Sequence, residues 1–178
     1  IDIWRGRKSL AYKTNDEVIK PQQAIERLFQ LTRGREVYVT TEVGQHQMWA
    51  HQHIARDTTR SFLSSGGLGT MGFGFPAAVG AKIGCPDEQV VCIAGDGSFQ
   101  MNSQEMATAK INGVPVKVLI IDNRALGMVH QWQKLFYNER YSSTILDPVP
   151  DFVKLADAYG WQGERIEDPD QVEDAIQR

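Results

Sequence analysis

VVCIAGDGSFQMNSQEMATAKINGVPVKVLIIDN, residues 90–123, contains the pattern that decides the fold. One apolar run ends abruptly in Gly95-Asp96-Gly97, and a second apolar run ends in Asp122-Asn123. Apolar runs of this length, bounded by turn residues, are typical of buried strands in a parallel sheet, and the stretch between them is long enough for a crossover helix. The sequence therefore predicts a βαβ unit with Asp96 and Asn123 at the carboxyl ends of neighbouring strands, where open α/β sheets bind ligands.

These two strand ends carry oxygen atoms of the kind that Mg²⁺ prefers. A carboxylate from Asp96 and a carboxamide oxygen from Asn123 are hard ligands, and phosphate oxygens and water are expected to supply most of the remaining positions. Simpler roles stay open, because Asp is also a common helix N-cap and Asn a common turn residue. The glycines on both sides of Asp96 and the downstream Asn123 favour the metal site over these roles.

The length and composition of the chain limit the classes of protein to which it can belong. The chain has 178 residues, 42% hydrophobic and 23% charged, which is ordinary for one globular domain with a proper core. Its net charge of −3 does not suggest a nucleic-acid surface, so a phosphate ligand needs local positive charge. Cys85 and Cys92 are too few for a disulfide framework, which favours a reducing, cytoplasmic compartment. No apolar stretch approaches the ~20 residues of a membrane span, so no membrane partner is expected.

The order of elements predicts an α/β fold, a three-layer sandwich with a central, mostly parallel sheet and helices on both faces. Residues 1–20 are expected to be a linker with a solvated basic cluster of Arg5, Arg7 and Lys8. Strands are expected over residues 36–41, 61–64, 90–94, 116–121 and 161–166. Helices are expected over residues 21–34, 49–53, 75–83, 127–136 and 151–160, and from residue 168 onward. Because the chain starts at Ile1 and stops inside a helical pattern, we expect a piece of a longer protein.

A glycine-rich loop over residues 67–72 (GLGTMG) formally matches the G-x-G-x-x-G pattern of dinucleotide-binding domains. In that alternative, Asp96 would bind a ribose. The pairing of Asp96 with Asn123 and the polar Gln45-His46-Gln47 at another strand end speak against it. The histidines at 46, 51 and 53 do not form a zinc site, because no Cys or second His pair completes a tetrahedral spacing.

The GDG…DN arrangement resembles the metal motif of the thiamine-diphosphate enzymes, usually GDG…NN. Asp122 stands where the first Asn is common, but the metal-binding second position is intact as Asn123. The resemblance implies that Asp96, Asn123 and the main-chain carbonyl of Ala125 hold Mg²⁺ against the cofactor's diphosphate. Residues 44–49, 65–72 and 126–133 are similar, within that group, to acetohydroxyacid (acetolactate) synthase catalytic subunits. Residues 21–178 would then be the C-terminal diphosphate-binding domain, truncated at its C-terminus.

The resemblance also implies roles for further residues. Met71 would support the folded conformation of thiamine diphosphate, although an unbranched Met is also a common gap filler. Met128, Val129 and Trp132 would border a substrate channel, although aromatic residues at helical spacing are usually core. The implied cofactor-binding set is Gln45, His46, Gln47, Gly69, Met71, Gly95, Asp96, Gly97, Ser98, Asn123, Ala125, Leu126, Gly127, Met128 and Val129.

The implied reaction is that of a transferase in branched-chain amino-acid biosynthesis. It decarboxylates pyruvate on thiamine diphosphate and joins the product to a second 2-ketoacid, pyruvate or 2-ketobutyrate. The Glu that activates the cofactor would come from a domain outside this stretch, so no catalytic residue is assigned here and the fragment alone is expected to be inactive. FAD would sit against another absent domain. A homodimer or homotetramer is expected, with or without a regulatory small subunit. The alternative is another thiamine-diphosphate enzyme, a pyruvate oxidase or a 2-ketoacid decarboxylase.

Overall fold

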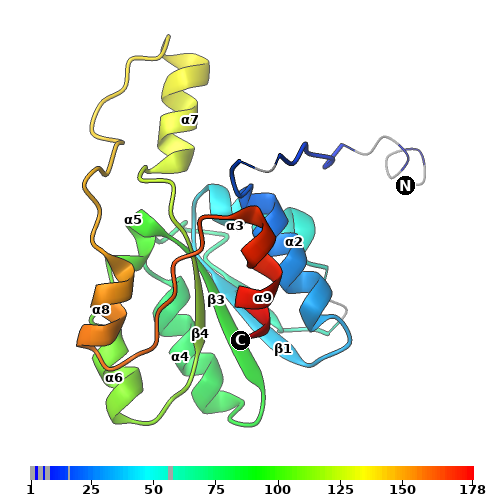
Figure 1. Cartoon of the computed structure of the whole chain (residues 1–178), viewed down its shortest axis with the longest axis vertical. Coiled ribbons are helices and arrows are strands. Elements are labelled where there is room, and N and C mark those ends of the chain that lie inside the picture. Colours follow the sequence, from blue (N-terminus) through cyan, green and yellow to red (C-terminus); the bar gives the residue numbers. More distant parts are fainter. Residues whose placement is uncertain (1–2, 4–5, 7–8, 16, 56–57) are drawn as a thin grey trace.

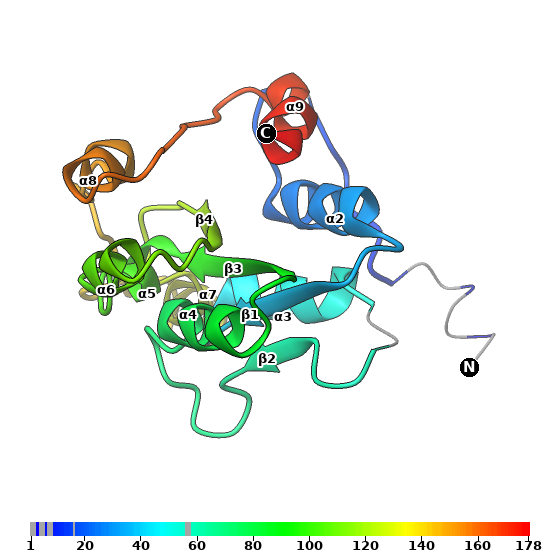
Figure 2. The ribbon, with the colours of Figure 1, turned by 90° about the horizontal axis from the view of Figure 1, so that it is seen from below.

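The computed structural model describes residues 3, 6, 9–15, 17–55 and 58–178, and the basic cluster of Arg5, Arg7 and Lys8 lies outside them. Within the described residues, four parallel strands form a sheet in the order β2-β1-β3-β4, with helices on both faces (Figures 1 and 2). The strands are β1 (Val37–Thr41), β2 (Phe62–Ser64), β3 (Gln89–Gly95) and β4 (Lys117–Ile121). The α/β sandwich that the sequence predicts is confirmed.

The helices follow the strands along the chain, as a doubly covered parallel sheet requires. Their bounds are α2 (Pro21–Thr32), α3 (Gln45–His53), α4 (Gly74–Gly84), α5 (Asp96–Phe99), α6 (Glu105–Ile111), α7 (Gly127–Phe136), α8 (Phe152–Ala158) and α9 (Val172–Gln177), with a short 3-10 helix η1 (Pro169–Gln171) before α9. Local chemistry explains several of these ends. Pro21 occupies the first turn of α2, the Asp151 carboxylate accepts from two backbone N–H groups at the start of α8, and Gly160 takes a positive φ of 70° after it.

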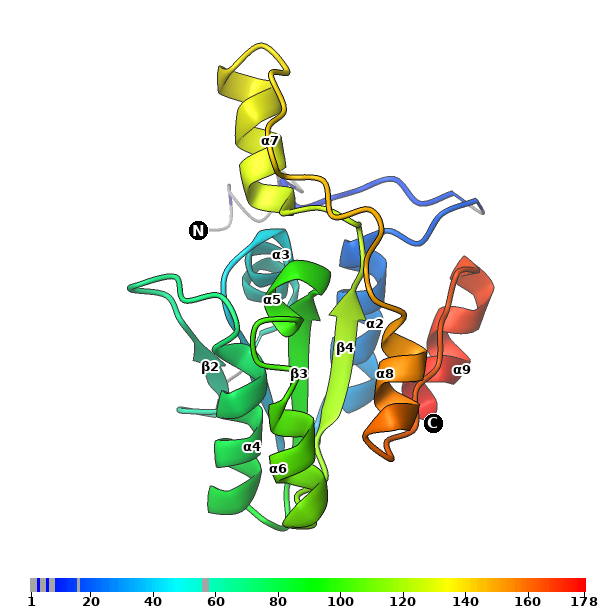
Figure 3. The same ribbon diagram turned by 90° about the vertical axis from the view of Figure 1, so that its left-hand side faces the viewer.

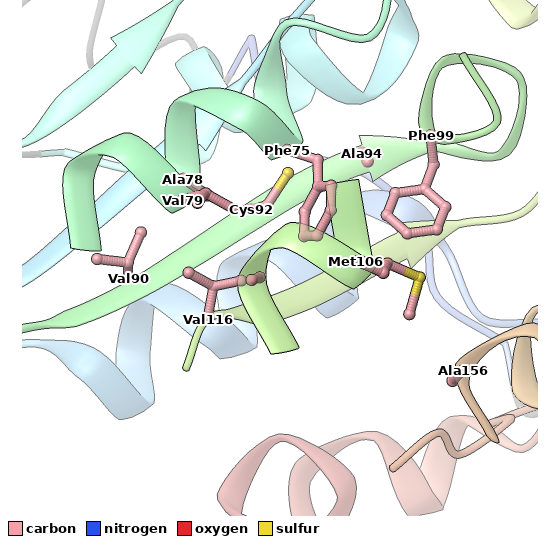
Figure 4. Close-up of a cluster of buried hydrophobic side chains, with 11 residues drawn as sticks. Phe75, Ala78, Val79, Val90, Cys92, Ala94, Phe99, Met106, Val116 and Ala156 are labelled. Carbon is pink, nitrogen blue, oxygen red and sulfur yellow. The ribbon is translucent and has the colours of Figure 1, made fainter. Parts of the chain in front are cut away.

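Strand β3 is the centre of two cores because its side chains alternate between the two faces of the sheet. On one face, Val90, Cys92 and Ala94 pack with residues of α4, α5, α6 and α8 (Figure 4). On the other face, Val91 and Ile93 pack with residues of β1, α2 and α3, and α9 contacts this side through a partly buried isoleucine. A strand buried on both faces must be apolar throughout, which explains the continuous apolar run in the sequence.

The connection from β3 to β4 differs from the single crossover helix that we expect from the sequence. It contains two short helices, α5 and α6, separated by a turn over residues 100–104. Asn102 fastens this turn to the glycine-rich loop, because its Nδ2 donates to the carbonyl oxygen of Gly72 at 2.8 Å. The turn therefore ties the β3 end to the segment that precedes α4.

The expected strand over residues 161–166 is wrong, because these residues form no strand and pair with no strand of the described sheet. They are held by neighbouring helices instead. Trp161 donates its backbone N–H to Ala156 and its Nε1–H to the Met106 carbonyl oxygen at 3.2 Å. Gly163 lies directly against α8, since a Cβ there would come within 3.2 Å of Val153 Cα. The segment follows α8 and does not extend the sheet beyond β4.

Helix α7 and the described residues from 9 to 20 lie outside the packed layers of the sandwich. Helix α7 stands beyond the carboxyl ends of the strands, away from the body of the sheet (Figures 1 and 3), and none of its residues is buried among those described. The described residues from 9 to 20 belong to no helix or strand, and Tyr12 among them donates to Glu26 at 2.6 Å. None of the described helices combines the length and apolarity needed to cross a membrane.

Candidate functional site

A cavity lies among residues at the carboxyl ends of β1, β3 and β4 and in the first turn of α7. Figure 3 shows the ends of β3 and β4 below α7. Its walls come from the connections that follow these three strands, from the first turn of α7 and from Met71 of the glycine-rich loop. Its volume is about 120 Å³, which is smaller than the range of about 300–1,000 Å³ that is usual for small-molecule sites. The topology therefore gathers polar residues that are far apart in the sequence.

Asp96 is the most buried charged group of the cavity wall, with 1% of its surface exposed. Burial raises the pKa of its carboxyl group, and the nearby charge of Asp122 raises it further, against the opposing effect of backbone N–H groups that include those of Gly97 and Arg124. Its Oδ2 is buried and has no hydrogen-bond partner in the described part of the chain. A buried carboxylate oxygen without a partner is unfavourable unless a ligand completes it, and a cation fits that requirement.

Asn123 lies at the end of β4 in a turn that fixes its amide group. Its Oδ1 accepts from the backbone N–H of Ala125 at 3.1 Å, and its Nδ2 lies 3.4 Å from Oε1 of Gln45. Gln45 in turn donates to Gln131 of α7 at 2.9 Å. Three amide groups from three segments of the chain therefore form one connected series beside Asp96.

A second segment supports this turn from outside. Leu126 donates its N–H to the carbonyl oxygen of Thr144, and Leu146 donates to that of Arg124, both at 2.8 Å. The Thr144 hydroxyl donates to Oε1 of Gln133 on α7 at 2.8 Å. We call residues 142–146 the strap, because they hold the β4–α7 connection and α7 together.

The oxygen donors around the cavity suit a hard divalent cation. Among the described residues, no three His, Cys, Asp or Glu side chains gather into a metal-binding group. A metal here would therefore be held by the Asp96 carboxylate and by neutral amide and carbonyl oxygens, with its other positions filled by ligand oxygens or water. That donor set fits Mg²⁺ and does not fit a structural zinc site.

Glycines let the backbone approach the cavity closely. A Cβ at Gly97 would lie 2.8 Å from Leu126 Cδ2 and 3.0 Å from Leu146 Cδ1, and a Cβ at Gly95 would lie 2.8 Å from His46 Nδ1. Real Cβ atoms do not come this close to other atoms, so a side chain at Gly95 would displace the His46 ring and one at Gly97 would displace the two leucine side chains. The GDG tripeptide of the sequence thus fits between the strap and the ring of His46.

His46 is held by a buried carboxylate that the sequence analysis did not single out. Glu42 follows β1 directly and is fully buried, and its Oε1 lies 3.1 Å from His46 Nε2 while its Oε2 accepts from the Gly74 N–H at 2.9 Å. A charged residue directly after a β-branched strand was the available sequence signal. It gave no hint of burial, because its partner Gly74 is distant in the chain.

The structure brings most of the sequence-predicted site residues to this one cavity. Its lining contains Gln45, His46, Met71, Asn123, and residues 95–98 and 125–129. Four further lining residues, Val43, Gly44, Trp49 and Ile121, were not assigned to the site from the sequence, since they are apolar or lack a side chain.

Three predicted residues lie elsewhere in the structure. Gln47 donates to the Ser64 hydroxyl at 2.9 Å, at the end of β2, and Gly69 packs near Val43. Trp132 lines a separate hollow with Val129 and residues 133, 137 and 140. Since Val129 borders both spaces, the Trp132 hollow adjoins the cavity along α7.

The dinucleotide alternative meets an obstacle in the strand order. The glycine-rich loop follows β2, and β1 lies between β2 and β3. Asp96 therefore does not end the strand beside the one that precedes the glycine loop, as the ribose-binding acid of that motif does. It shares a cavity with Asn123 instead.

Comparison with known proteins matches this geometry. Residues 42–178 match the family model described as thiamine pyrophosphate enzyme, C-terminal TPP binding domain. Acetolactate synthase large subunit from Haemophilus influenzae is 49% identical over 177 residues, which are 99% of this chain and 31% of that protein. Acetolactate synthase isozyme 2 large subunit from Escherichia coli is 58% identical over 138 residues, which are 78% of this chain and 25% of that protein. A probable acetolactate synthase large subunit from Methanococcus aeolicus is 49% identical over 166 residues, which are 91% of this chain and 28% of that protein. The chain thus spans less than a third of the length of these relatives.

Proposed function

This chain belongs to the thiamine pyrophosphate enzymes as their C-terminal cofactor-binding domain, and on that premise we propose that it is the cofactor-binding part of an acetolactate synthase catalytic subunit. The proposed reaction joins the two-carbon product of pyruvate decarboxylation to a second 2-ketoacid, pyruvate or 2-ketobutyrate. The relatives named as acetolactate synthase large subunits support this choice, with identities of 49% over nearly the whole chain and 58% over a shorter part. The observation that carries the proposal is the unpartnered Asp96 oxygen beside Asn123 in one cavity.

In this proposal Asp96, Asn123 and the Ala125 carbonyl hold Mg²⁺, which neutralises the diphosphate of the cofactor. The fit rests on the donor set, since a carboxylate, an amide oxygen and a main-chain carbonyl are hard ligands. The amide series through Gln45 and Gln131 orients Asn123 before any ligand arrives. Preorganisation of this kind lowers the entropy lost on binding.

Thiamine diphosphate supplies, when bound, the electron sink for decarboxylation of a 2-ketoacid. The chain's own residues position it and exclude water. Met71 reaches toward the GDG turn, since its Cε would lie 3.8 Å from a Cβ at Gly97. Met128 and Val129 form the cavity wall at the base of α7, and Trp132 lies in the adjoining hollow, as a residue that selects the second ketoacid would.

The rest of the proposed enzyme lies outside the described chain. The carboxylate that activates the cofactor and the contacts to FAD are assigned to other parts of the full-length subunit. The printed name "large subunit" of the relatives supports a small regulatory subunit as a partner, and we propose a homodimer or homotetramer of catalytic subunits in the cytoplasm.

Two assays test the proposal on the intact protein. Mg²⁺ with thiamine diphosphate should raise the melting temperature, whereas Mg²⁺ with NAD should not. Pyruvate should then yield acetolactate, and pyruvate with 2-ketobutyrate should yield the mixed acetohydroxyacid. Acetaldehyde or acetate as the main product would instead indicate a decarboxylase or an oxidase, and a melting shift with NAD alone would contradict the cofactor assignment.

A further inference from the structure

The glycine-rich loop of residues 67–72, all of them described, contributes a single residue, Met71, to the cofactor cavity. Three of its six residues are glycines, which have the greatest backbone freedom. The loop is exposed at its tip, where 96% of the surface of Leu68 is open to solvent, so packing does not restrain it there. The place of Met71 therefore depends on the segment that follows it, Gly72-Phe73-Gly74.

The far end of this segment, Gly74, is fixed to the end of β1. The Thr40 hydroxyl donates to the Gly74 carbonyl oxygen at 2.8 Å, and the Gly74 N–H donates to Oε2 of Glu42 at 2.9 Å. Thr40 and Glu42 are both fully buried, so water does not compete for these two bonds. The start of α4 is thus a fixed point behind the loop.

Asn102 holds the near end of the segment, directly beside Met71. Its Nδ2 donates to the Gly72 carbonyl oxygen at 2.8 Å, and its Oδ1 accepts from Nε2 of Gln104 at 3.2 Å, which orients the amide group. No other side chain of the described residues forms a hydrogen bond with residues 71–73. A Cβ at Gly72 would lie 2.8 Å from Asn102 Nδ2, so the two residues pack directly on each other.

Asn102 and the proposed metal ligand Asp96 belong to the same short connection between β3 and β4. This connection holds its own shape. The Gln100 side chain donates to the Asp96 carbonyl oxygen at 3.0 Å, and the Asn102 N–H donates to the Phe99 carbonyl oxygen at 3.4 Å. The separation between Asp96 and Met71 is therefore set where Asn102 grips Gly72.

We propose that Asn102 is a positioning residue that sets the place of Met71 relative to Asp96, so that a cofactor anchored by its diphosphate is bent over the Met71 side chain. The inference rests on the proposed function, in which Met71 supports the folded conformation of thiamine diphosphate. That conformation brings the aminopyrimidine to the C2 proton of the thiazolium ring, so removal of this proton gains the advantage of an intramolecular step. Asn102 does not line the cavity and acts through Gly72.

Three variants of the intact protein separate this role from a general one. Asn102→Leu keeps the branching at Cγ and removes the N–H donor without adding charge. Asn102→Ser, whose hydroxyl ends one bond short of Nδ2, is measured beside it. Asn112→Leu is the matched control, because the Asn112 Nδ2 donates to the Thr108 carbonyl oxygen, also at 2.8 Å, at the end of α6.

The first readout needs no cofactor. The methyl group of Met71 is followed by NMR in protein that contains methionine labelled with carbon-13 at the methyl group, and Met71→Leu identifies its signal. In both Asn102 variants the signal should move toward the shift of free methionine, because the loop has lost one of its two anchors. Asn112→Leu should leave the signal in place.

The second readout compares anchoring with bending. The affinity for thiamine diphosphate at saturating Mg²⁺ should change little in the Asn102 variants, since the proposed metal ligands are untouched. Exchange of the C2 proton of the bound cofactor with solvent deuterium should slow by at least about tenfold, because a misplacement of about 1 Å can cost about a hundredfold. Asn112→Leu should match the wild type in both measurements.

A Met71 signal and a C2 exchange rate like those of the wild type in both Asn102 variants would overturn the inference and leave the proposed function intact. Affinity and exchange rate that fall in equal proportion, or two variants that do not fold, would show a general structural role and also overturn it. If the wild type shows no Mg²⁺-dependent binding of thiamine diphosphate, the proposed function and this inference fall together.

Discussion

At the scale of single residues, the buried Asp96 carboxylate makes the metal-free protein less stable. Asp96 has a raised pKa, caused first by burial and then by Asp122. An Asp in the unfolded chain ionises near 3.8, so between that value and the folded pKa the folded chain binds more protons than the unfolded chain. The stability of the metal-free protein therefore falls as the pH rises through this window.

Asp96→Asn should stabilise the metal-free protein at neutral pH by about 1 kcal/mol, which is typical of substitutions that relieve an unfavourable functional site. The gain should shrink as the pH falls toward 3.8, where the wild-type carboxyl is protonated as well. Thermal unfolding of both proteins between pH 4 and 8, without Mg²⁺, checks this. A stability difference that does not vary with pH would show that the Asp96 charge is not its origin.

Gly127 and Gly80 differ in how much room the structure leaves for a side chain. A Cβ at Gly127 would collide with Gln45 Oε1 and come within 2.8 Å of Asn123 Nδ2, whereas one at Gly80, inside α4, would meet nothing within 4 Å. Gly127→Ala should destabilise the protein by about 1–3 kcal/mol, as overpacking does. Gly80→Ala should stabilise it by up to about 1 kcal/mol through helix propensity. Urea unfolding of the two variants measures both, and equal effects would contradict the packing found around the amide series.

At the scale of elements, the β4–α7 connection depends on the strap of residues 142–146. Thr144 is 3% exposed, its hydroxyl reaches Gln133, and its carbonyl oxygen accepts from Leu126. The strap therefore links the β4–α7 connection to the polar side of α7.

Thr144→Val should weaken this link by about 1 kcal/mol, the value of one buried hydrogen bond. Hydrogen exchange at the amide groups of Leu126 and Leu146 should then become several times faster. Thr108→Val, at an exposed position on α6, is the matched control and should leave these two amides unchanged. Unaltered exchange in Thr144→Val would show that the strap does not restrain the turn.

Elements with a strong local signal could be predicted from the sequence. The strands before Asp96 and Asn123 are continuous apolar runs with sharp ends, so the carboxyl-end site followed from topology alone. Partners that are distant in the chain could not be predicted. The contact of Glu42 with Gly74 depends on how α4 returns to the sheet, and residues 161–166 resemble a strand until α8 is seen to hold Trp161.

At the scale of the whole molecule, α7 is the most exposed apolar element near the site. Trp132, Leu135 and Phe136 are 53%, 62% and 71% exposed. Exposed apolar side chains gathered on one element are typical of a surface that contacts other protein, and we propose that α7 is such a surface.

The 178-residue chain should therefore self-associate in a concentration-dependent manner. Leu135→Ser with Phe136→Ser should weaken association at least about tenfold, since two large apolar side chains leave the contact. Leu68→Ser removes an even more exposed leucine, at 96%, from the glycine-rich loop, outside α7, and should have little effect. Sedimentation velocity over a range of concentrations decides, and a wild-type monomer at every concentration would refute this expectation.

The central claim is that Asp96 and Asn123 hold a divalent cation that anchors the diphosphate. Titration of the intact protein with thiamine diphosphate, with and without Mg²⁺, tests it most directly when Asp96→Asn and Asn123→Ala are measured beside the wild type. The wild type should bind tightly only with Mg²⁺, and both variants should lose most of that Mg²⁺ dependence. Binding by the wild type that does not depend on Mg²⁺, or variants that keep the full Mg²⁺ effect, would contradict the account.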